Sequence, residues 1–258
     1  MPSLEAFLMF LGCVVVASIL QNLTAFAFGL VLLGLVELLG IVPLADATNA
    51  SMVLALLNSL VFIWRERQPL PWGQVKHVLW GSTIGVTAGL WLQVWLSANA
   101  AVWLRLLLGV VVILAAANLV LAGRVRTETS PPRSFAIFGA LSGVLGGLFA
   151  ASGPPIVYHM LRQPFDPLYI RRCLVLIFAV NNAFRLVLVT GTGQLSQQSV
   201  ILCCAALPVA FLVTMLCMRY PIKVSRDRLM RFTGALLCVA GASLMLSGAR
   251  KVLLPLLV

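Results

Sequence analysis

The stretch of residues 142–160 constrains this chain more than any other, because it is apolar enough for a bilayer yet cannot form one continuous helix. Gly153, Pro154 and Pro155 interrupt it, since proline lacks the backbone N–H and its ring clashes with the preceding helical turn. Proline is favoured in the first turn of a helix and Ser152 is a suitable cap, so a short second helix is predicted to follow. A break at membrane depth is tolerated only where protein buries it or where it lines a cavity.

A helix N-terminus in such a cavity attracts anions, because its unpaired N–H groups and the helix dipole both favour negative charge. We therefore expect Ser152, Gly153, Pro154 and Pro155 to form part of a substrate-binding site for an anion. The structural alternative is a kink that neighbouring helices simply pack against.

The composition of the chain indicates a membrane protein. Of the 258 residues, 61% are hydrophobic and only 10% are charged, whereas soluble domains contain about 25% charged residues. The net charge of +11 comes from Lys and Arg in short loops, which positive-inside topology explains without a nucleic-acid partner. The six cysteines show no CxxC or Cys/His spacing, so we predict no metal site and no cofactor.

Apolar segments recur along the whole chain. The first, residues 4–42, is too long for one crossing of about 20 residues, and we expect it to break near residues 22–26. The apolar runs that follow in the first half predict three crossings, at 48–64, 77–97 and 101–122. The second half repeats this order, with a broken segment at 134–161 and crossings at 173–190, 199–218 and 232–249.

The shared order of segments indicates an internal duplication. Three pairs of identical residues are separated by 124 or 125 positions: Gly29 and Gly153, Asn58 and Asn182, and Gly109 and Gly234. The loop after the broken segment has no Lys or Arg in the first half, at 43–48, but has three arginines in the second half, at 162–172. Because the later loops alternate in the same opposed way, the positive-inside rule predicts opposite orientations for the two halves.

The predicted fold is an all-α polytopic membrane protein with two inverted-topology repeats, each a broken helix hairpin followed by three transmembrane helices. Residues 1–122 form the first repeat, 123–133 a cytoplasmic linker and 134–258 the second repeat, in one integral membrane domain with its N-terminus outside. Many secondary transporters have this architecture and bind substrate where the two breaks meet. We therefore expect a multi-pass transporter of the bacterial cytoplasmic membrane that works by alternating access.

Polar side chains within the apolar runs are further candidates for the substrate site. Asn58 and Asn182 lie at equivalent positions of their crossings, where they either bind substrate oxygens or join helices by hydrogen bonds. Arg185 costs about 2.5 to 3.5 kcal/mol at a helix centre on insertion scales, so it either binds an anionic substrate or snorkels to the outer interface. Asn22 and Thr24 are expected to line the first break.

The motifs of the second half point to one family. They are the run Gly143-Val-Leu-Gly-Gly-Leu-Phe-Ala-Ala-Ser-Gly-Pro-Pro-Ile-Val-Tyr158, then Arg172, and then Asn181-Asn182-Ala-Phe-Arg185. In these residues the chain resembles the sulfite exporter TauE/SafE family of bacterial membrane transporters. The first half departs from the family's usual Gly-rich run ending in Pro and keeps only Gly29 and Gly34. The resemblance implies export of a small sulfur-containing or organic anion such as sulfite, a sulfonate or sulfoacetate.

An intramembrane enzyme is the main alternative from another class. Ala150-Ala-Ser-Gly153 is similar to the Gly-x-Ser-Gly of intramembrane serine proteases, but its first residue is Ala and no His follows residue 159. With no HExxH and no facing base for a serine nucleophile, we predict no enzymatic activity and no catalytic residue. A non-transporting membrane assembly protein is the other alternative.

Two further expectations concern partners other than the substrate and the lipid bilayer. Glu37 would carry a coupling proton if it were buried, although its position favours an interfacial carboxylate close to Asp46. A homodimer is a secondary expectation.

Overall fold

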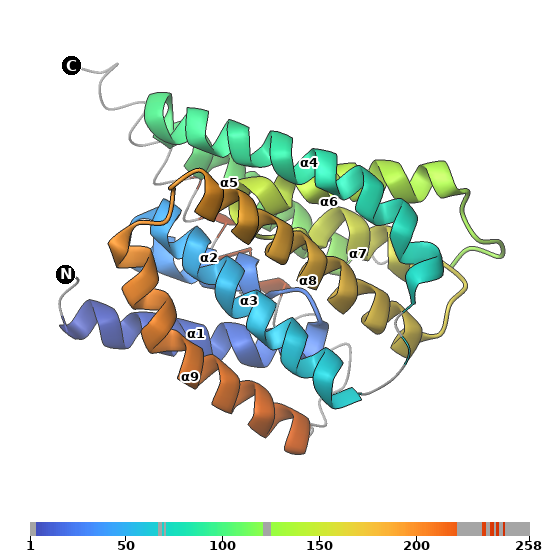
Figure 1. The fold of residues 1–258 in the computed structure, drawn as a ribbon, viewed down its shortest axis with the longest axis horizontal. Coiled ribbons are helices and arrows are strands. Elements are labelled where there is room, and N and C mark those ends of the chain that lie inside the picture. Colours follow the sequence, from blue (N-terminus) through green and yellow to red (C-terminus); the bar gives the residue numbers. More distant parts are fainter. Residues whose placement is uncertain are drawn as a thin grey trace.

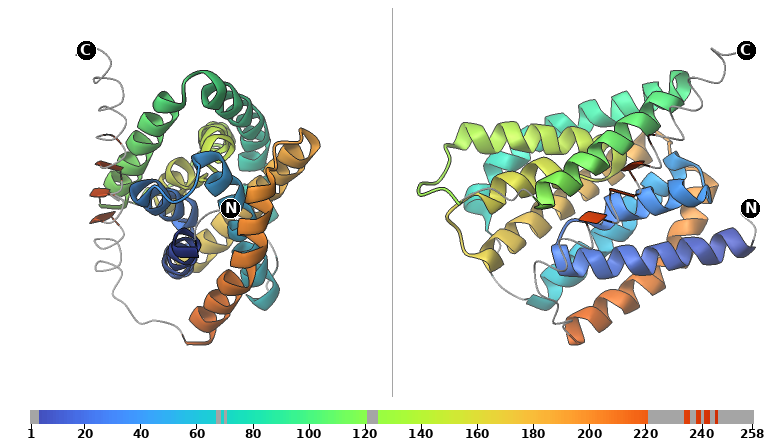
Figure 2. Two further views of the ribbon diagram at one scale, coloured as in Figure 1. Left: turned by 90° about the vertical axis from the view of Figure 1, so that its left-hand side faces the viewer. Right: turned by 180° about the vertical axis from the view of Figure 1, so that it is seen from behind.

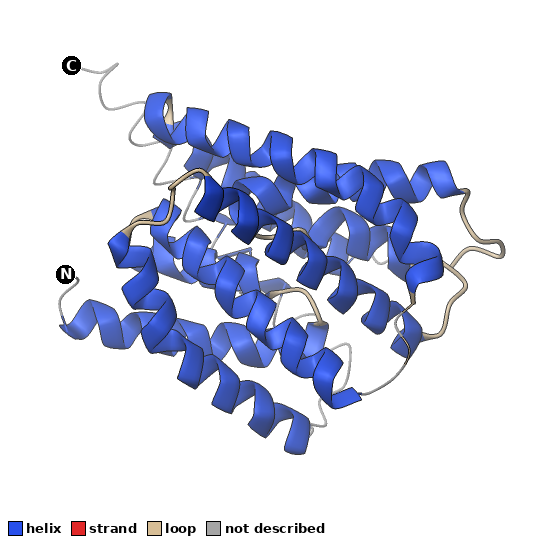
Figure 3. Cartoon of the chain, viewed as in Figure 1, coloured by secondary structure: helices blue, strands red, loops and turns tan. Residues whose placement is uncertain are grey.

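The computed structural model describes residues 4–66, 69, 71–120 and 125–220, together with seven positions between 234 and 245. Within this part of the chain the regular structure is entirely helical, and short loops join the helices (Figure 3). Five of the helices are long and apolar enough to cross a membrane. The predicted all-α class of a polytopic membrane protein is therefore confirmed.

The first half forms five helices, and its long apolar segment is broken as predicted. The break lies at residues 25–27, so Asn22 and Thr24 belong to the last turn of the first helix and not to the break itself. The helices are α1 (Leu4–Thr24), α2 (Phe28–Leu39), α3 (Leu44–Glu66), α4 (Trp72–Asn99) and α5 (Ala101–Val120).

The second half repeats the pattern, and its break falls at residues 150–152 as the prolines predict. The helices are α6 (Pro132–Phe149), α7 (Gly153–Leu161), α8 (Pro167–Gly191) and α9 (Gln197–Arg219). Most of the crossing predicted at 232–249 lies outside the described residues. Helices of the two halves pack on one another, because α3 contacts α8 and α9, and α1 lies beside α9 (Figure 2).

The helices run roughly along one axis, so the described connections other than the two breaks lie at the two ends (Figure 1). The start of α1 and the loops at 40–43 and 192–196 lie at the left-hand end, and these loops contain no Lys or Arg. At the opposite end the Arg126 N–H donates to the Arg162 carbonyl at 2.9 Å, which joins the connection before α6 to the end of α7. Basic loops of both halves therefore lie at one end, which we call the basic end.

Rows of glycine bring α4 and α6 into backbone contact. Gly81, Gly85 and Gly89 recur every fourth residue on α4, and a matching row on α6 consists of Gly139, Gly143 and Gly147. A Cβ atom built on Gly85 would overlap the carbonyl oxygen of Ala140. Small residues at this spacing let membrane helices approach closely where lipid provides no hydrophobic drive for association. The contact fixes α6, and with it the second break, against α4.

Substitution Gly85→Ala should lower the thermal unfolding midpoint of the purified protein, because the methyl group would overlap the Ala140 carbonyl and force α4 from α6. Overpacking of this kind costs about 1 to 3 kcal/mol. Gly12→Ala in α1 is the matched control, since among the described residues no atom of another helix lies within 4 Å of its Cβ position. Equal midpoints for the two variants would contradict the close-packed interface.

Candidate functional site

The two helix breaks have the same local conformation. Ala25 after α1 and Ala150 after α6 both take left-handed backbone angles, with φ values of 72° and 50°. The N–H of Ala25 donates to the Gln21 carbonyl at 2.7 Å, and that of Ala150 donates to the Gly146 carbonyl at 2.9 Å. Each helix therefore ends in a left-handed cap, which stops the helix and satisfies one of its open carbonyls.

The two breaks also pack against each other. A Cβ atom on Gly29 in α2 would lie 2.8 Å from the Ala150 carbonyl oxygen. A Cβ atom on Gly153 in α7 would lie 2.9 Å from the ring of Phe26. Each member of this matched glycine pair thus faces the break of the opposite half, and the approach buries backbone that hydrocarbon could not satisfy.

The start of α7 has fewer hydrogen-bond donors for an anion than the sequence predicts. Pro154 and Pro155 have no N–H, so two of the first three residues of α7 contribute no donor. Ser152 occupies the cap position, but its side chain makes no cap hydrogen bond, so the predicted serine cap is wrong. Its carbonyl instead accepts a hydrogen bond from the Ser142 hydroxyl, which helps to close the break.

Arg185 in α8 is buried among three other helices and is only 1% exposed. Its Nε donates to the Gly147 carbonyl of α6 at 3.0 Å, and its Nη2 donates to Gln93 Oε1 of α4 at 2.8 Å. Its Nη1 contacts two atoms of α3, Asn49 Oδ1 at 3.4 Å and Met52 Sδ at 3.3 Å. We call these five residues the Arg185 cluster. The inward position shows that the snorkelling alternative is wrong.

Asn58 belongs to a separate polar group. Its Nδ2 donates to Gln21 Oε1 at 2.7 Å, and its Oδ1 accepts from the Thr214 hydroxyl at 2.7 Å. Asn22 Nδ2 donates to the same Thr214 oxygen at 3.2 Å. These four residues form the Asn58 network, which joins α1, α3 and α9 through hydrogen bonds.

Thr24 and Asn182 differ in whether their side chains form hydrogen bonds. The Thr24 hydroxyl donates to the Leu20 carbonyl at 2.7 Å and accepts from the Ala27 N–H at 3.2 Å, so it closes the first break. Asn182 is 7% exposed, and its side chain has no hydrogen-bond partner among the described residues. The Asn182 side chain is therefore available to bind a ligand, whereas the Thr24 hydroxyl already bonds two backbone groups.

The structure divides the predicted site residues into two groups. Arg185 contacts Asn49, whereas Asn58 lies nine residues further along α3, a distance of about 14 Å at 1.5 Å per residue. Asn182 precedes Arg185 by three residues and shares its helix face, so it lies with the Arg185 cluster. Asn58 and Arg185 are thus not brought together at a single point.

Asn49 and Gln93 complete the Arg185 cluster, although neither was a predicted site residue. Gln93 carries an amide side chain inside the apolar run 77–97, and this position is a signal that could have identified it. Asn49 lies near the start of its crossing, where a polar residue is ordinary, so the sequence gives little reason to select it. Within the described residues, no three His, Cys, Asp or Glu side chains gather as a metal site would require.

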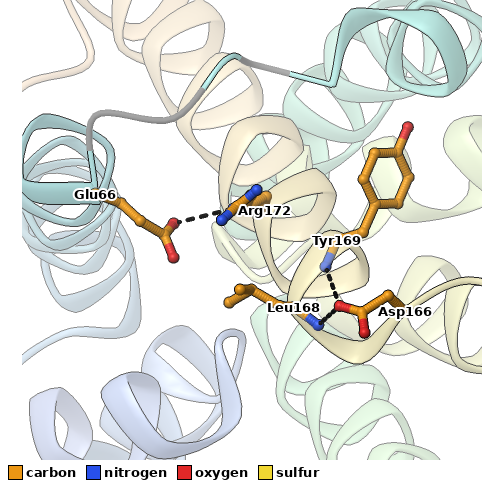
Figure 4. A network of polar contacts seen from close by, with 5 residues as sticks. All are labelled: Glu66, Asp166, Leu168, Tyr169 and Arg172. Carbon is orange, nitrogen blue, oxygen red and sulfur yellow. Dashed lines mark hydrogen bonds and ion pairs between the residues drawn. The ribbon is translucent and has the colours of Figure 1, made fainter.

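An ion pair joins α3 to α8 at the basic end. Arg172 Nε lies 3.5 Å from Glu66 Oε2, and both side chains are about a quarter exposed (Figure 4). Asp166 caps α8 beside this pair, because its side chain accepts from the N–H groups of Leu168 at 2.8 Å and Tyr169 at 3.3 Å. These contacts fix the first turns of α8 against the end of α3.

The fold and these polar groups define a class of protein: a polytopic helical membrane protein with paired helix breaks and a cation held in its interior. The sequence profile of the family described as sulfite exporter TauE/SafE matches residues 10–244. The chain therefore belongs to this transporter family, and it is a multi-pass protein of the cytoplasmic membrane.

Two curated relatives are similar over most of their length. The chain is 31% identical over 226 residues to the probable sulfite/organosulfonate exporter TauE of Cupriavidus necator, a match that covers 88% of each chain. It is 26% identical over 206 residues to the probable inner membrane transporter protein TsaS of Comamonas testosteroni, covering 80% of this chain and 81% of that one. No solved structure matches.

The two matched asparagines should respond differently to substitution. Asn58→Ala leaves the side chains of Gln21 and Thr214 without their buried partner and should cost about 1 to 2 kcal/mol. Asn182→Ala removes no hydrogen bond to the described residues and should leave the thermal unfolding midpoint nearly unchanged. A larger loss of stability in Asn182→Ala than in Asn58→Ala would contradict this assignment.

Proposed function

We propose that this protein is a secondary transporter that exports sulfite, a sulfonate or sulfoacetate across the cytoplasmic membrane by alternating access. Membership of the TauE/SafE family supports the transporter class. The name of the relative from Cupriavidus necator supports sulfur oxyanions as substrates and export as the direction. The Arg185 cluster supplies a chemical reason for anion binding.

The buried guanidinium of Arg185 is the observation that carries the proposal. A charge within a transmembrane segment is costly and normally has a partner, yet its four acceptors are all neutral. A guanidinium has five N–H donors, so four contacts leave at least one for a ligand. An oxyanion would supply the missing negative charge and accept paired hydrogen bonds, displacing the long contact with Asn49 and the weak one with Met52.

Neighbouring asparagines favour an anion with several oxygens. Asn181 and Asn182 lie four and three residues before Arg185, so their side chains are its neighbours on the helix. Asn181 Oδ1 accepts from the Ser82 hydroxyl at 2.8 Å, while its Nδ2 is buried and has no hydrogen-bond partner among the described residues. Donors that lack acceptors therefore gather around the guanidinium, as the three oxygens of sulfite or a sulfonate require.

Alternating access would follow from two inverted repeats, residues 1–122 and 134–258, joined by a cytoplasmic linker at 123–133. Three observations support this arrangement. The two breaks share one backbone conformation, the matched glycines Gly29 and Gly153 face opposite breaks, and the α1–α2 and α6–α7 hairpins open toward opposite ends (Figure 1). The basic end would face the cytoplasm, with the N-terminus outside.

Glu37 is the carboxylate that would couple export to a proton gradient. Its side chain is 8% exposed and pairs with Arg105 of α5 at 3.4 Å, and carboxylates in transmembrane segments commonly relay protons. In vesicles, Glu37→Gln should transport the anion without responding to an imposed pH gradient. An unchanged response would exclude Glu37 as the proton carrier.

That the protein forms a homodimer stays a prediction.

A sulfur oxyanion should stabilise the purified protein, and this stabilisation should depend on Arg185. A ligand at 100 times its Kd adds about 2.7 kcal/mol to the free energy of unfolding. Among sulfite, sulfoacetate, taurine, sulfate and acetate, we expect a rise of the thermal midpoint with sulfite or a sulfonate. Arg185→Gln should abolish the rise of the midpoint. Arg185→Lys should weaken it, because lysine keeps the charge but lacks the planar guanidinium that forms paired hydrogen bonds.

Arg172→Gln is the control for this experiment, because it removes a basic side chain whose partner is Glu66 and not the proposed site. It should retain the stabilisation by the anion. If Arg185→Gln were stabilised as strongly as the unmodified protein, Arg185 would not bind the anion. If no anion shifted the unmodified protein, the proposed substrate class would be wrong.

A further inference from the structure

We propose that Arg171 is a second anion-binding station of the transport path, at the basic end of the helix face that carries Arg185. The inference rests on the proposed function, since it concerns the same anion. Arg171 belongs to the basic loop 162–172 of the sequence pattern, where topology alone would account for it. The structure instead turns its side chain into the protein.

Arg171 and Arg185 lie on one face of α8. They are 14 residues apart, which places them about 21 Å apart along the helix axis and within about 40° of each other around it. Asn182 lies on the same face, about 20° from Arg171. At one end of this face the Arg171 guanidinium stacks 4.6 Å from the Phe62 ring of α3, and at the other Arg185 contacts Asn49 of α3. Both arginines therefore face the contact between α8 and α3.

The contacts of Arg171 leave donors open. Its Nη2 donates to the Asn22 carbonyl at 2.9 Å, which ties α8 to the Asn58 network and to the helix end before the first break. Its Nε is buried and makes no hydrogen bond with the described residues. Arg171 thus binds the backbone just before the first break, at Asn22. Arg185 likewise binds the backbone just before the second break, at Gly147.

The Arg171 guanidinium forms no ion pair with a carboxylate among the described residues. Glu66 pairs with Arg172 at 3.5 Å and attracts Arg171 only from a longer distance. Within the part of the chain that the structure describes, Arg171 has no carboxylate within 4.0 Å. Arg171 is therefore open to a small oxyanion arriving at the basic end. The anion would bind Arg171 before it reaches Arg185.

A purely structural role for Arg171 is the competing explanation, because its bond to the Asn22 carbonyl caps the end of α1. Arg171→Gln separates the two roles. Glutamine retains an N–H donor for the Asn22 carbonyl but has no charge, whereas Arg171→Lys retains the charge. A structural cap would therefore survive in the glutamine variant, and an anion station would survive better in the lysine variant.

The test is uptake of radiolabelled sulfite by inside-out membrane vesicles, which present the basic end to the added anion. Arg171→Gln should raise the KM by about tenfold or more, as loss of a charge-assisted contact does. Arg171→Lys should restore much of the affinity. The double variant Glu66→Gln/Arg172→Gln, which removes the neighbouring ion pair without changing the net charge, should change the KM little. Stabilisation of purified Arg171→Gln by sulfite should persist, because Arg185 is intact.

An equal KM for Arg171→Gln and Glu66→Gln/Arg172→Gln would overturn the second station, as would an Arg171→Lys variant no better than Arg171→Gln. These results would leave the proposed function standing, because the unmodified protein would still take up sulfite. If the unmodified protein neither took up sulfite nor was stabilised by it, the proposed function would fail, and the second station with it.

Discussion

Backbone groups opened inside a bilayer must find partners within the protein, and this constraint shapes the centre of the molecule. Two breaks interrupt membrane-spanning segments, and each is closed by a left-handed alanine, at Ala25 and at Ala150. Gly29 and Gly153 then let the breaks approach within a distance that any side chain would prevent. The interior is therefore organised around a pair of breaks that protein, and not lipid, must enclose.

Close packing and polar contact have separate roles around this centre. The glycine rows of α4 and α6 hold the second break against a neighbouring helix, while α8 presents its polar face to α3. The Arg185 cluster lies toward one end of that face. Arg171, which contacts Asn22 of the Asn58 network, lies toward the other end. In the proposed cycle an anion would pass between these two cations as the helices around the breaks rearrange.

Much of the fold could be predicted from the sequence, because the responsible signals are local. Gly153-Pro154-Pro155 predicts the second break, and apolar length predicts the first. The spatial division between Asn58 and Arg185 could not be predicted, because it depends on how far α3 slides along α8, which no local pattern encodes. Ser152 misled for a local reason: a capping side chain accepts from the N–H of the second or third helix residue, and in α7 these are Pro154 and Pro155, which have none.

The central claim is that a sulfur oxyanion binds at the buried guanidinium of Arg185. The most direct measurement is a crystal structure of the protein with 2-bromoethanesulfonate, in which anomalous scattering locates the bromine and difference density locates the sulfonate. The account predicts the sulfonate against Arg185, with the contacts to Asn49 and Met52 displaced. A well-occupied sulfonate elsewhere in the interior, with the Arg185 cluster unchanged, would contradict it.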